Sequence, residues 1–481
     1  MSDSKLVFAH FIVGNSHPYT FNDWVEDILK ASRHLLDGFV LNVGRDDWQL
    51  DRVADCYEAA RQFSRSSNGR SFKLFISFDL AVIPGAEKED VALLQQYIAR
   101  FGRHPNQLVY KRGVVVSTFA GQDCTFGKND LDSGWRFVKD LLEHVVERPI
   151  HFIPSFFIDP RRYSTMPWLN GYFHWNGGWP IHLKPSDPRS KIHNPSLDSD
   201  TEHLRHLEGK TYMAAVSPCF FTHYGEDSWN KNWIYRSDDH LLVRRWEHLI
   251  NSNIADRIDI VQVISWNDYG ESHYLSSPRY PACQPNSNKW VDGFPHEGWL
   301  DLNAWFIHAF KLRQSLGGSQ GTCNTYLAMN INRNISTREN KARIWMWGRP
   351  HLKGADASDD TVGKPKGWQL ADDTFDIVVV SPYPDTFLEV TCGPPISHHR
   401  RVYRNLSPGR LHRFSHPMYP GFSMKATLRV GRESSLQQSE DDIEAEGVVV
   451  AVCDSETYGF RFLHNFEVEN YNFNSFVCMS D

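Results

Sequence analysis

The chain has 481 residues, of which 41% are hydrophobic, enough for a large core and for more than one domain. Its formal net charge is -7, with 58 acidic and 51 basic residues and no long basic run, so the charge pattern favours neither nucleic acid nor an anionic membrane surface as a partner. Aromatic residues make up 13% of the chain, which suits a flat, neutral ligand such as a sugar ring as well as a well-filled core.

The N-terminus and the cysteines exclude further classes of protein. The first residues, MSDSKLVFAHFIVG, enter a strand-like pattern almost at once, without a basic leader or a cleavage site, so we expect no signal peptide. No apolar run approaches the roughly 18–20 residues that span a bilayer, so we expect no membrane-embedded segment. The eight cysteines are scattered singly, without a CxxC pair, which argues against a zinc ribbon or a redox pair.

Short apolar runs that end in polar or small residues recur along the first two thirds of the chain. We predict eight strands, at 5–14, 38–44, 72–79, 113–121, 149–157, 171–176, 211–218 and 259–268. Amphipathic stretches predict helices at 21–36, 51–63, 88–101, 133–145, 238–250 and, after the eighth strand, 299–316. Alternating strands and helices predict a parallel sheet, and eight units fit a (β/α)8 TIM barrel better than an open doubly wound sheet.

The pattern changes beyond about Gly321, where strand-like pieces follow one another without helices between them. These pieces cover 342–349, 374–382, 386–393, 424–431 and 447–454. They predict a C-terminal β-sandwich, so we divide the chain into a catalytic barrel, 1–320, and an accessory sandwich, 321–481. The acidic stretch 431–447 is predicted to be a solvated loop within the sandwich.

The densest group of polar residues follows the eighth predicted strand, in DIVQVISWNDYGESHY at 259–274. In a (β/α)8 barrel the functional groups come from the C-terminal ends of the strands. Glycoside hydrolysis usually needs one carboxylic acid to protonate the leaving oxygen and a second carboxylate to activate water or attack the sugar. Asp268 and Glu271 meet this need if the chain bends, because residues three apart on a continuing strand face opposite ways. Gly270 permits such a bend.

The runs FISFD, VVVSTFAG, HFIPSFF and SWNDYGESHY, in this order, resemble the fungal α-1,3-glucanases called mutanases, glycoside hydrolase family 71. The resemblance covers the whole predicted barrel. It implies a (β/α)8 catalytic domain with a β-sandwich behind it, hydrolysis of α-1,3-glucosidic bonds in cell-wall glucan, and inversion at the anomeric carbon. The glucan substrate implies action at the cell wall or outside the cell. Many family members carry an export signal, and the N-terminus as written shows none, so a protein that is cytoplasmic until release is the alternative.

The family's WNDYGES motif points to the same two carboxylates. We assign Glu271 as general acid and Asp268 as general base, and the two roles can be exchanged. An acid that stays protonated needs a raised pKa, which burial against Trp266 or Tyr269 beside a second carboxylate would produce. An inverting pair is expected to stand roughly 6.5–9.5 Å apart, against about 5–5.5 Å for a retaining pair. The structural alternative is an ion pair or a helix cap at a loop end.

Asp79, at the end of the third predicted strand, is the reserve candidate. It would bind a sugar hydroxyl, or serve as the base if Asp268 only orients Glu271, although a strand-end Asp also caps turns. The remaining substrate-binding candidates are amides, carboxylates, histidines and aromatic residues at strand ends: Asn42, Asp46, Asp47, Trp48, His174, Trp175, Asn176, Trp179, His223, Tyr224, Trp266, Asn267, Tyr269 and His273. Each aromatic residue fits a core position nearly as well as a stacking face, and Asp46 or Asp47 fits a helix cap.

Other functional classes fit less well. His10, His174, His223 and His273 with Asp79 resemble the ligand set of a metal-dependent barrel hydrolase, but no HxH follows the first strand. No GxSxG elbow for a serine nucleophile is present. A non-catalytic glucan-binding protein would keep the aromatic residues but would not need two carboxylates in one loop. We therefore expect a monomeric hydrolase of α-1,3-glucan and its oligosaccharides, with no metal, no cofactor, no nucleic-acid partner and no membrane partner.

Overall fold

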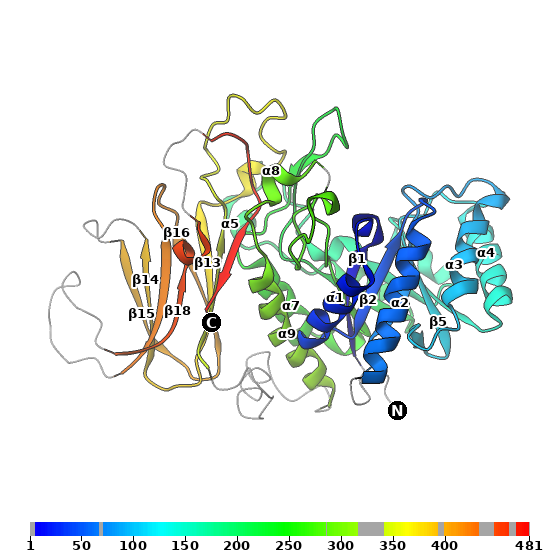
Figure 1. Cartoon of the computed structure of the whole chain (residues 1–481), viewed down its shortest axis with the longest axis horizontal. Helices are drawn as coiled ribbons and strands as arrows, with labels where there is room; N and C mark the ends of the chain where they lie inside the picture. Colours follow the sequence, from blue (N-terminus) through cyan, green and yellow to red (C-terminus); the bar gives the residue numbers. More distant parts are fainter. Residues whose placement is uncertain are drawn as a thin grey trace.

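The computed structural model describes residues 5–66, 71–284, 286–315, 341–392, 399–431, 447–460 and 468–480. A first part with helices around a parallel sheet (blue to green) lies beside a second part of antiparallel strands (yellow to red), as Figure 1 shows. The predicted boundary at 320 falls within residues 316–340, outside the described residues. None of the helices in the described part of the chain is both long and apolar enough to cross a lipid bilayer.

The first part is built on eight parallel strands in one curved sheet, and they confirm the eight strands predicted from the sequence. They are β1 (Leu6–Ile12), β2 (Gly38–Val43), β3 (Lys73–Asp79), β5 (Gly113–Phe119), β6 (Ile150–Ser155), β7 (Gly171–His174), β8 (Thr211–Val216) and β11 (Ile260–Val263). They pair in the order β6-β5-β3-β2-β1-β11-β8-β7, and the short β4 (Val109–Tyr110) adds antiparallel to β5. The two end strands, β6 and β7, share no ladder, but the Asn170 N–H, just before β7, donates to the Phe152 carbonyl of β6 at 3.2 Å.

The helices of the described residues are α1 (Phe21–Arg33), α2 (Gln49–Ser66), α3 (Val91–Phe101), α4 (Leu131–Val146), α5 (Arg189–His193), α6 (Asp200–His206), α7 (Leu241–Asn251), α8 (Asn288–Val291) and α9 (Glu297–Ser315). The short helices α5, α6 and α8 were not predicted, whereas α1, α2, α3, α4, α7 and α9 lie at the predicted places. Local side-chain chemistry fixes their starts: Asp130 accepts the Ser133 N–H at 2.8 Å and so caps α4. Thr20 and Asp23 form a capping box at α1.

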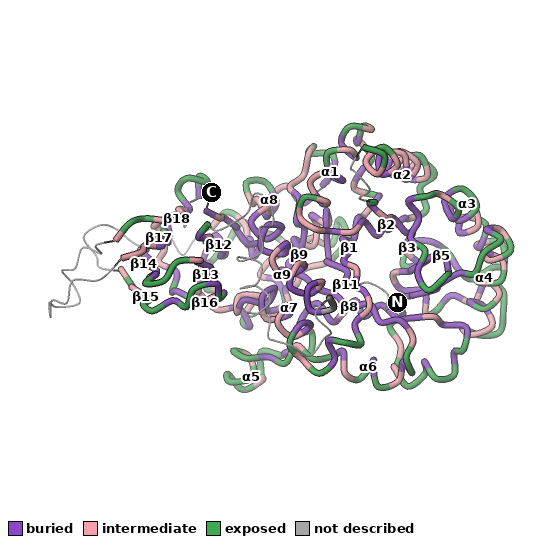
Figure 2. The backbone as a smooth tube through the Cα atoms, turned by 90° about the horizontal axis from the view of Figure 1, so that it is seen from below, coloured by how far each residue is buried: buried purple, intermediate pink, exposed green. Residues whose placement is uncertain are grey.

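Successive side chains along the parallel strands face opposite sides of the sheet and so form two apolar layers. Side chains of one parity, such as Phe8, Val40 and Phe75, form an inner cluster enclosed by the sheet, and those of the other parity pack outward against the helices. Figure 2 shows the buried strands within more exposed helices. Toward the C-terminal ends of the strands the inner positions become polar, at His10, Asn42, Ser77, Asp79, Ser117, Ser155, Ser217 and Gln262. The polar end of the sheet is therefore the place for a site.

The second part contains two four-stranded antiparallel sheets. One has the order β16 (Leu411–Pro417), β13 (Thr374–Val380), β12 (Arg343–Gly348) and β19 (Phe476–Met479), and the other β15 (Arg400–Leu406), β14 (Thr386–Cys392), β17 (Met424–Val430) and β18 (Val448–Asp454). Both sheets contribute to one apolar cluster, with Ile344 and Ile377 from the first and Leu388 and Leu428 from the second. Five of these strands were predicted. Most of the predicted loop at 431–447 lies outside the described residues.

A short hairpin, β9 (Phe221–His223) and β10 (Asn232–Ile234), stands apart from these sheets. It follows β8 at the polar end of the parallel sheet. The two parts of the chain also contact each other through α9, where the Trp345 indole of β12 donates to Asp301 at 3.1 Å. The second part is thus packed directly against the first, close to the segment that carries the hairpin.

Candidate active site

The segment after β11 turns sharply at the polar end of the parallel sheet. The Ser265 N–H donates to the His273 carbonyl at 2.7 Å, so the chain doubles back within nine residues, 265–273. Asn267 fixes the turn to the end of β1, because its side chain both accepts from the Ile12 N–H and donates to the Ile12 carbonyl, at 2.8 and 2.9 Å. Ser272, with φ 62°, takes the left-handed conformation that closes the turn. This fold brings Asp268 and Glu271 onto the same side.

Glycine is required at position 270 for a different reason from the one predicted. The left-handed residue of the turn is Ser272, whereas Gly270 does not have a positive φ. A Cβ at Gly270 would instead lie 2.3 Å from the Tyr224 phenolic oxygen and 3.1 Å from its ring. Gly270 is therefore needed so that Tyr224, from the hairpin, can approach the backbone between the two carboxylates.

We expect Gly270→Ala to lower kcat/KM by about 100-fold, because the added methyl group must displace either Tyr224 or the turn, and a shift of about 1 Å near reacting groups has an effect of this size. Adding Tyr224→Phe removes the nearest atom and should recover part of the loss. Steady-state kinetics of the single and double variants, with melting curves to confirm folding, check this. A double variant no more active than Gly270→Ala would refute the role given to the phenolic oxygen.

The two carboxylates share one histidine and one lysine. The imidazole Nε2 of His273 lies 3.2 Å from Glu271 Oε2 and 3.6 Å from Asp268 Oδ2, and its Nδ1 lies 3.1 Å from the Ser265 hydroxyl. The Lys231 ammonium donates to Glu271 Oε1 at 3.1 Å. The side chains of Asp268 and Glu271 are 14% and 18% exposed, so both carboxylates are largely shielded but still open to solvent on one side.

The surroundings shift the pKa values of the two carboxyl groups in opposite directions. Burial and the neighbouring Glu271 raise the pKa of Asp268 to about 6. Burial acts on Glu271 in the same sense but is outweighed by the His273 hydrogen bond and the Lys231 charge, which lower its pKa to about 2. Between these values the pair titrates as a unit and holds one proton, and the directions of the two shifts favour Asp268 over Glu271 as its holder.

The spacing of the pair differs from the expectation for an inverting enzyme. One oxygen of Asp268, one of Glu271 and a nitrogen of His273 all lie within 4.8 Å of one another. The nearest oxygens are thus closer than the roughly 6.5–9.5 Å of an inverting pair and near the about 5–5.5 Å of a retaining pair. The reason is local: Asp268 Oδ1 accepts the Glu271 N–H at 3.1 Å, and His273 faces both carboxylates.

Three neighbours of the pair are core residues, which corrects their prediction as sugar contacts. The Trp266 side chain is fully buried, and its indole donates to Asp27 at 3.1 Å. Tyr269 is also buried and packs on Tyr274, with ring centroids 5.2 Å apart. Asn267 is buried and is hydrogen-bonded to the end of β1, as described above. Their side chains fix the turn and offer no face to a ligand.

Two predicted histidines also face away from the carboxylates. His174 has the outward parity of β7, stacks on His203 with ring centroids 3.8 Å apart, and bonds to the Ser199 hydroxyl at 2.9 Å. His223 lies buried between Asn232 and Asp360, at 2.9 and 2.8 Å. Neither is placed to bind substrate or a metal, and this corrects both predictions.

Trp175 and Trp179 form a largely buried layer beneath the site. The Trp175 ring lies edge-on to His10 at 4.9 Å, and the Trp179 ring lies 5.6 Å from that of His273. The Trp179 indole donates to the Cys219 carbonyl at 2.8 Å. The two indoles therefore support the imidazoles behind the carboxylates and expose little surface for stacking.

The other predicted residues are open to the polar end of the sheet. Burial raises the pKa of Asp79 to about 6, and its Oδ1 accepts the Ala81 N–H at 3.0 Å. The buried amide nitrogen of Asn42 has no hydrogen-bond partner among the residues that the structure describes. The loop after β2 carries two exposed carboxylates, Asp46 and Asp47, and the half-buried indole of Trp48. Asn176, after β7, and Tyr224, after β9, are also half-buried.

Two residues of the hairpin loop were not predicted as site residues. Lys231 contacts Glu271, and Trp229, two residues earlier, is 64% exposed, which is unusual for an indole. The stretch HYGEDSWNKNW places Gly225, Asp227 and Asn230 between aromatic residues, and this is a hairpin signal. That signal could have located the loop, although not the contact with Glu271.

Asp268, Glu271 and His273 are also a possible ligand set for a metal ion, since their ligand atoms lie within 4.8 Å of one another. The Lys231 ammonium, 3.1 Å from Glu271, already neutralises this carboxylate and would repel a divalent cation. This positive partner of Glu271 disfavours a metal ion between the three residues.

Comparison with known proteins identifies the group to which this site belongs. The sequence model of glycosyl hydrolase family 71 matches residues 3–478. The glucan endo-1,3-alpha-glucosidase agn1 of Schizosaccharomyces pombe is 36% identical over 390 residues, covering 81% of this chain and 80% of that protein. A mutanase of Penicillium rubens is 31% identical over 80% of this chain and 74% of its own. The ascus wall endo-1,3-alpha-glucanase of Schizosaccharomyces pombe is 32% identical over 78% of each chain. The chain belongs to glycosyl hydrolase family 71, and it is a glycoside hydrolase.

Proposed function

We propose that this glycoside hydrolase cleaves internal α-1,3-glucosidic bonds of fungal cell-wall glucan, acting as a monomer. The names of three relatives that match about four fifths of the chain, all endo-1,3-alpha-glucanases or mutanases, support the substrate. The observation that carries the chemistry is the pair of shielded carboxylates, Asp268 and Glu271, whose pKa values are shifted apart at the polar end of the sheet.

Asp268 is proposed as the general acid and Glu271 as the general base. Asp268 holds the proton in the free protein, whereas Glu271 is kept ionised by His273 and Lys231. This is the exchanged form of the assignment made from the sequence. Asp79, Asn42 and Asn176 are proposed to bind sugar hydroxyls, with Asp46, Asp47, Trp48 and Tyr224 around them.

Inversion, which the family resemblance implies, needs a water molecule between the base and the anomeric carbon. Because the nearest oxygens of the pair lie within 4.8 Å in the free protein, the two side chains have to separate when a sugar enters. Retention would need no such movement, and Glu271, the ionised carboxylate, would then be the nucleophile. The anomeric form of the first product distinguishes these two outcomes.

The scaffold is proposed to be a closed (β/α)8 barrel followed by a β-sandwich, divided near residue 320. The contact between the Asn170 N–H and the Phe152 carbonyl, at the gap between β6 and β7, supports closure. The common apolar cluster of the two antiparallel sheets supports the sandwich.

A panel of soluble glucans tests the proposed activity. We expect reducing ends to be released from carboxymethylated α-1,3-glucan but not from an α-1,4- or a β-1,3-linked glucan, because the site would have to position one bond geometry against both carboxylates. An endo mode predicts that viscosity falls early, when few reducing ends have formed. Binding of α-1,3-glucan without any release of reducing ends would replace the enzyme by a glucan-binding protein.

A further inference from the structure

Residues 221–240, the hairpin segment, connect the parallel sheet to α7 and carry Lys231. Within it, Tyr224 and Lys231 pair across β9 and β10, with backbone N–H to carbonyl distances of 2.7 and 3.0 Å. The hairpin of β9 and β10 therefore places the Lys231 ammonium next to Glu271. Such an isolated hairpin is at most marginally stable without further packing. What holds the hairpin segment thus decides where this ammonium lies.

The second part of the chain adds an isolated β-bridge, between Lys366 and Trp233, to the hairpin. The Ile234 N–H donates to the Lys366 carbonyl and the Lys366 N–H donates to the Asn232 carbonyl, both at 3.0 Å. The Asn232 side-chain amide donates to the carbonyls of Val362 and Gly363, at 3.1 and 3.0 Å. Residues 354–373, the junction loop between β12 and β13, therefore bind β10 directly beside Lys231.

A buried contact between His223 and Asp360 fixes the other strand of the hairpin. Because the Asn232 amide nitrogen is used by two carbonyls, its oxygen faces His223 Nδ1, 2.9 Å away, as an acceptor. His223 Nε2 lies 2.8 Å from Asp360 Oδ2, which also accepts the Tyr471 N–H at 2.9 Å. His223 is thus held between Asn232 of the hairpin and Asp360 of the junction loop.

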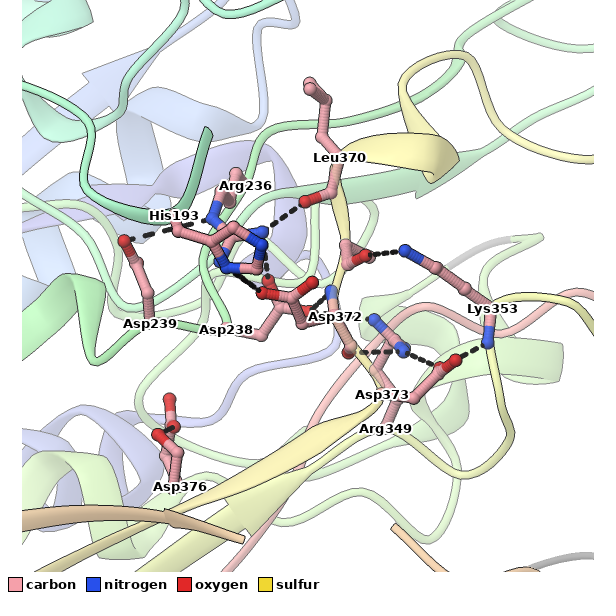
Figure 3. Close-up of polar contacts among 12 residues, drawn as sticks. His193, Arg236, Asp238, Asp239, Arg349, Lys353, Leu370, Asp372, Asp373 and Asp376 are labelled. Carbon is pink, nitrogen blue, oxygen red and sulfur yellow. Dashed lines mark hydrogen bonds and ion pairs between the residues drawn. The ribbon is translucent and has the colours of Figure 1, made fainter. Parts of the chain in front are cut away.

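The end of the hairpin segment that leads into α7 is also bound to the second part of the chain, through hydrogen bonds and ion pairs (Figure 3). Arg236 donates to the Leu370 carbonyl and lies 2.6 Å from Asp372. From the opposite side, Arg349 lies 2.9 Å from Asp238. The hairpin segment is therefore bound to the second part of the chain at β9, at β10 and at its return to α7.

We propose that the junction loop is part of the catalytic apparatus: through Asp360, His223 and Asn232 it positions Lys231 against Glu271. The inference rests on the proposed function, in which Glu271 is an acid–base residue. Asp360, His223 and Asn232 are positioning residues and touch no substrate. The charged groups around the ammonium are Glu271, Asp268 and Asp79, with His273 and His10 behind Glu271.

The position of Lys231 can be read from the pH profile of kcat/KM. Its charge lowers the pKa of Glu271, of Asp268 and of Asp79. Removing the charge by Lys231→Met should raise these pKa values, and the alkaline limb of the profile, which Asp268 sets, should then move to higher pH. Any variant that lets the ammonium move away from Glu271 should shift the profile in the same direction, whereas a general loss of stability would not.

Asp360→Asn is the informative variant, because it keeps the side-chain shape and replaces the carboxylate that contacts His223 and accepts the Tyr471 N–H. We expect kcat to fall about 10-fold, a fraction of the effect of a 1 Å misplacement, and the alkaline limb to move upward by part of the Lys231→Met shift. In the double variant Lys231→Met/Asp360→Asn, the profile should match that of Lys231→Met alone. Should Asp360→Asn not fold, Asn232→Ser removes the ties to Val362 and Gly363 from the hairpin side and should give the same partial shift.

Arg413→Gln is the matched control. Arg413 of β16 lies 3.3 Å from Glu247 of α7, so it also joins the two parts of the chain but does not touch the hairpin segment. We expect this variant to lower the melting temperature and to leave the pH profile equal to that of the wild type.

The outcomes separate the inference from the function on which it rests. A partial upward shift in Asp360→Asn, absent in Arg413→Gln and lost in the double variant, supports the positioning role. A shift in Lys231→Met without one in Asp360→Asn or Asn232→Ser overturns the inference and leaves the proposed function standing. An unchanged profile in Lys231→Met refutes the Lys231–Glu271 coupling itself, and hence the proposed acid–base assignment.

Discussion

Replacing Glu271 by Gln, or Asp268 by Asn, lowers kcat on an α-1,3-linked oligosaccharide by about 10²–10⁴-fold, the range that general acid–base groups contribute. Both replacements keep the shape of the side chain and remove its ability to exchange a proton, so substrate affinity should change little. Steady-state kinetics and a separate binding measurement on each variant check this. Asp140→Asn, an exposed carboxylate on α4, is the control and should keep full activity. Near-normal turnover in either variant would remove that residue from the mechanism.

The same two variants distinguish the acid from the base. An α-1,3-linked oligosaccharide with a fluoride leaving group needs little protonation, so it should restore turnover to Asp268→Asn, which lacks the proposed acid, but not to Glu271→Gln. Azide, a nucleophile that needs no base, should rescue Glu271→Gln and give a glycosyl azide. The opposite pattern would return the acid role to Glu271.

The pH dependence of kcat/KM should show a high plateau on the acidic side of neutrality and fall about tenfold per unit above about pH 6. The sign follows from the pair: the active form carries one proton, which Asp268 loses as the pH rises through its raised pKa, about 6. Glu271, whose pKa is lowered to about 2, stays ionised over the whole working range. Activity should therefore decline only on the alkaline side until strongly acidic conditions are reached.

Rates measured from about pH 3 to about pH 8 cover both the plateau and the alkaline limb. Circular dichroism at each pH confirms that the protein stays folded, so that a loss of activity can be assigned to the site. A rate that rises through pH 6, or stays level to pH 8, would contradict a proton held on Asp268.

Much of the fold follows from local patterns in the sequence. Buried parallel strands such as β2 and β8 read as nearly continuous apolar runs, and α1 and α4 start at capping residues, so their places could be predicted. Strands β15, β16 and β19 were missed. RRVYRNL and LHRFSHP are rich in charged and polar residues because β15 and β16 are edge strands with much of their surface exposed.

The candidate site could be predicted only where its residues are neighbours in the chain. Asp268 and Glu271 lie in one turn next to a recognisable strand, so the motif was enough to find both. Lys231 is 40 positions from Glu271, and His223 is 137 positions from Asp360. Such contacts depend on how distant segments pack, and no local pattern specifies them.

The sequence also could not show which aromatic residues face a ligand. The sequence offers Trp266 and Tyr269 beside the carboxylates, but a turn does not keep the alternation of a strand, so parity could not tell which side chains face a ligand. The structure buries both. The exposed indole of Trp229 belongs instead to the hairpin segment, two residues from Lys231.

The central claim is that Asp268 and Glu271 hydrolyse α-1,3-glucosidic bonds as an acid–base pair. A proton NMR time course on a soluble α-1,3-linked glucose oligomer tests it most directly, because the anomeric signals report cleavage and stereochemistry together before mutarotation. The account predicts that the β-anomer appears first with the wild-type protein and that neither anomer appears at a comparable rate with Glu271→Gln. An α-anomer appearing first would contradict inversion and make Glu271 a nucleophile, and the absence of any cleavage would contradict the hydrolase itself.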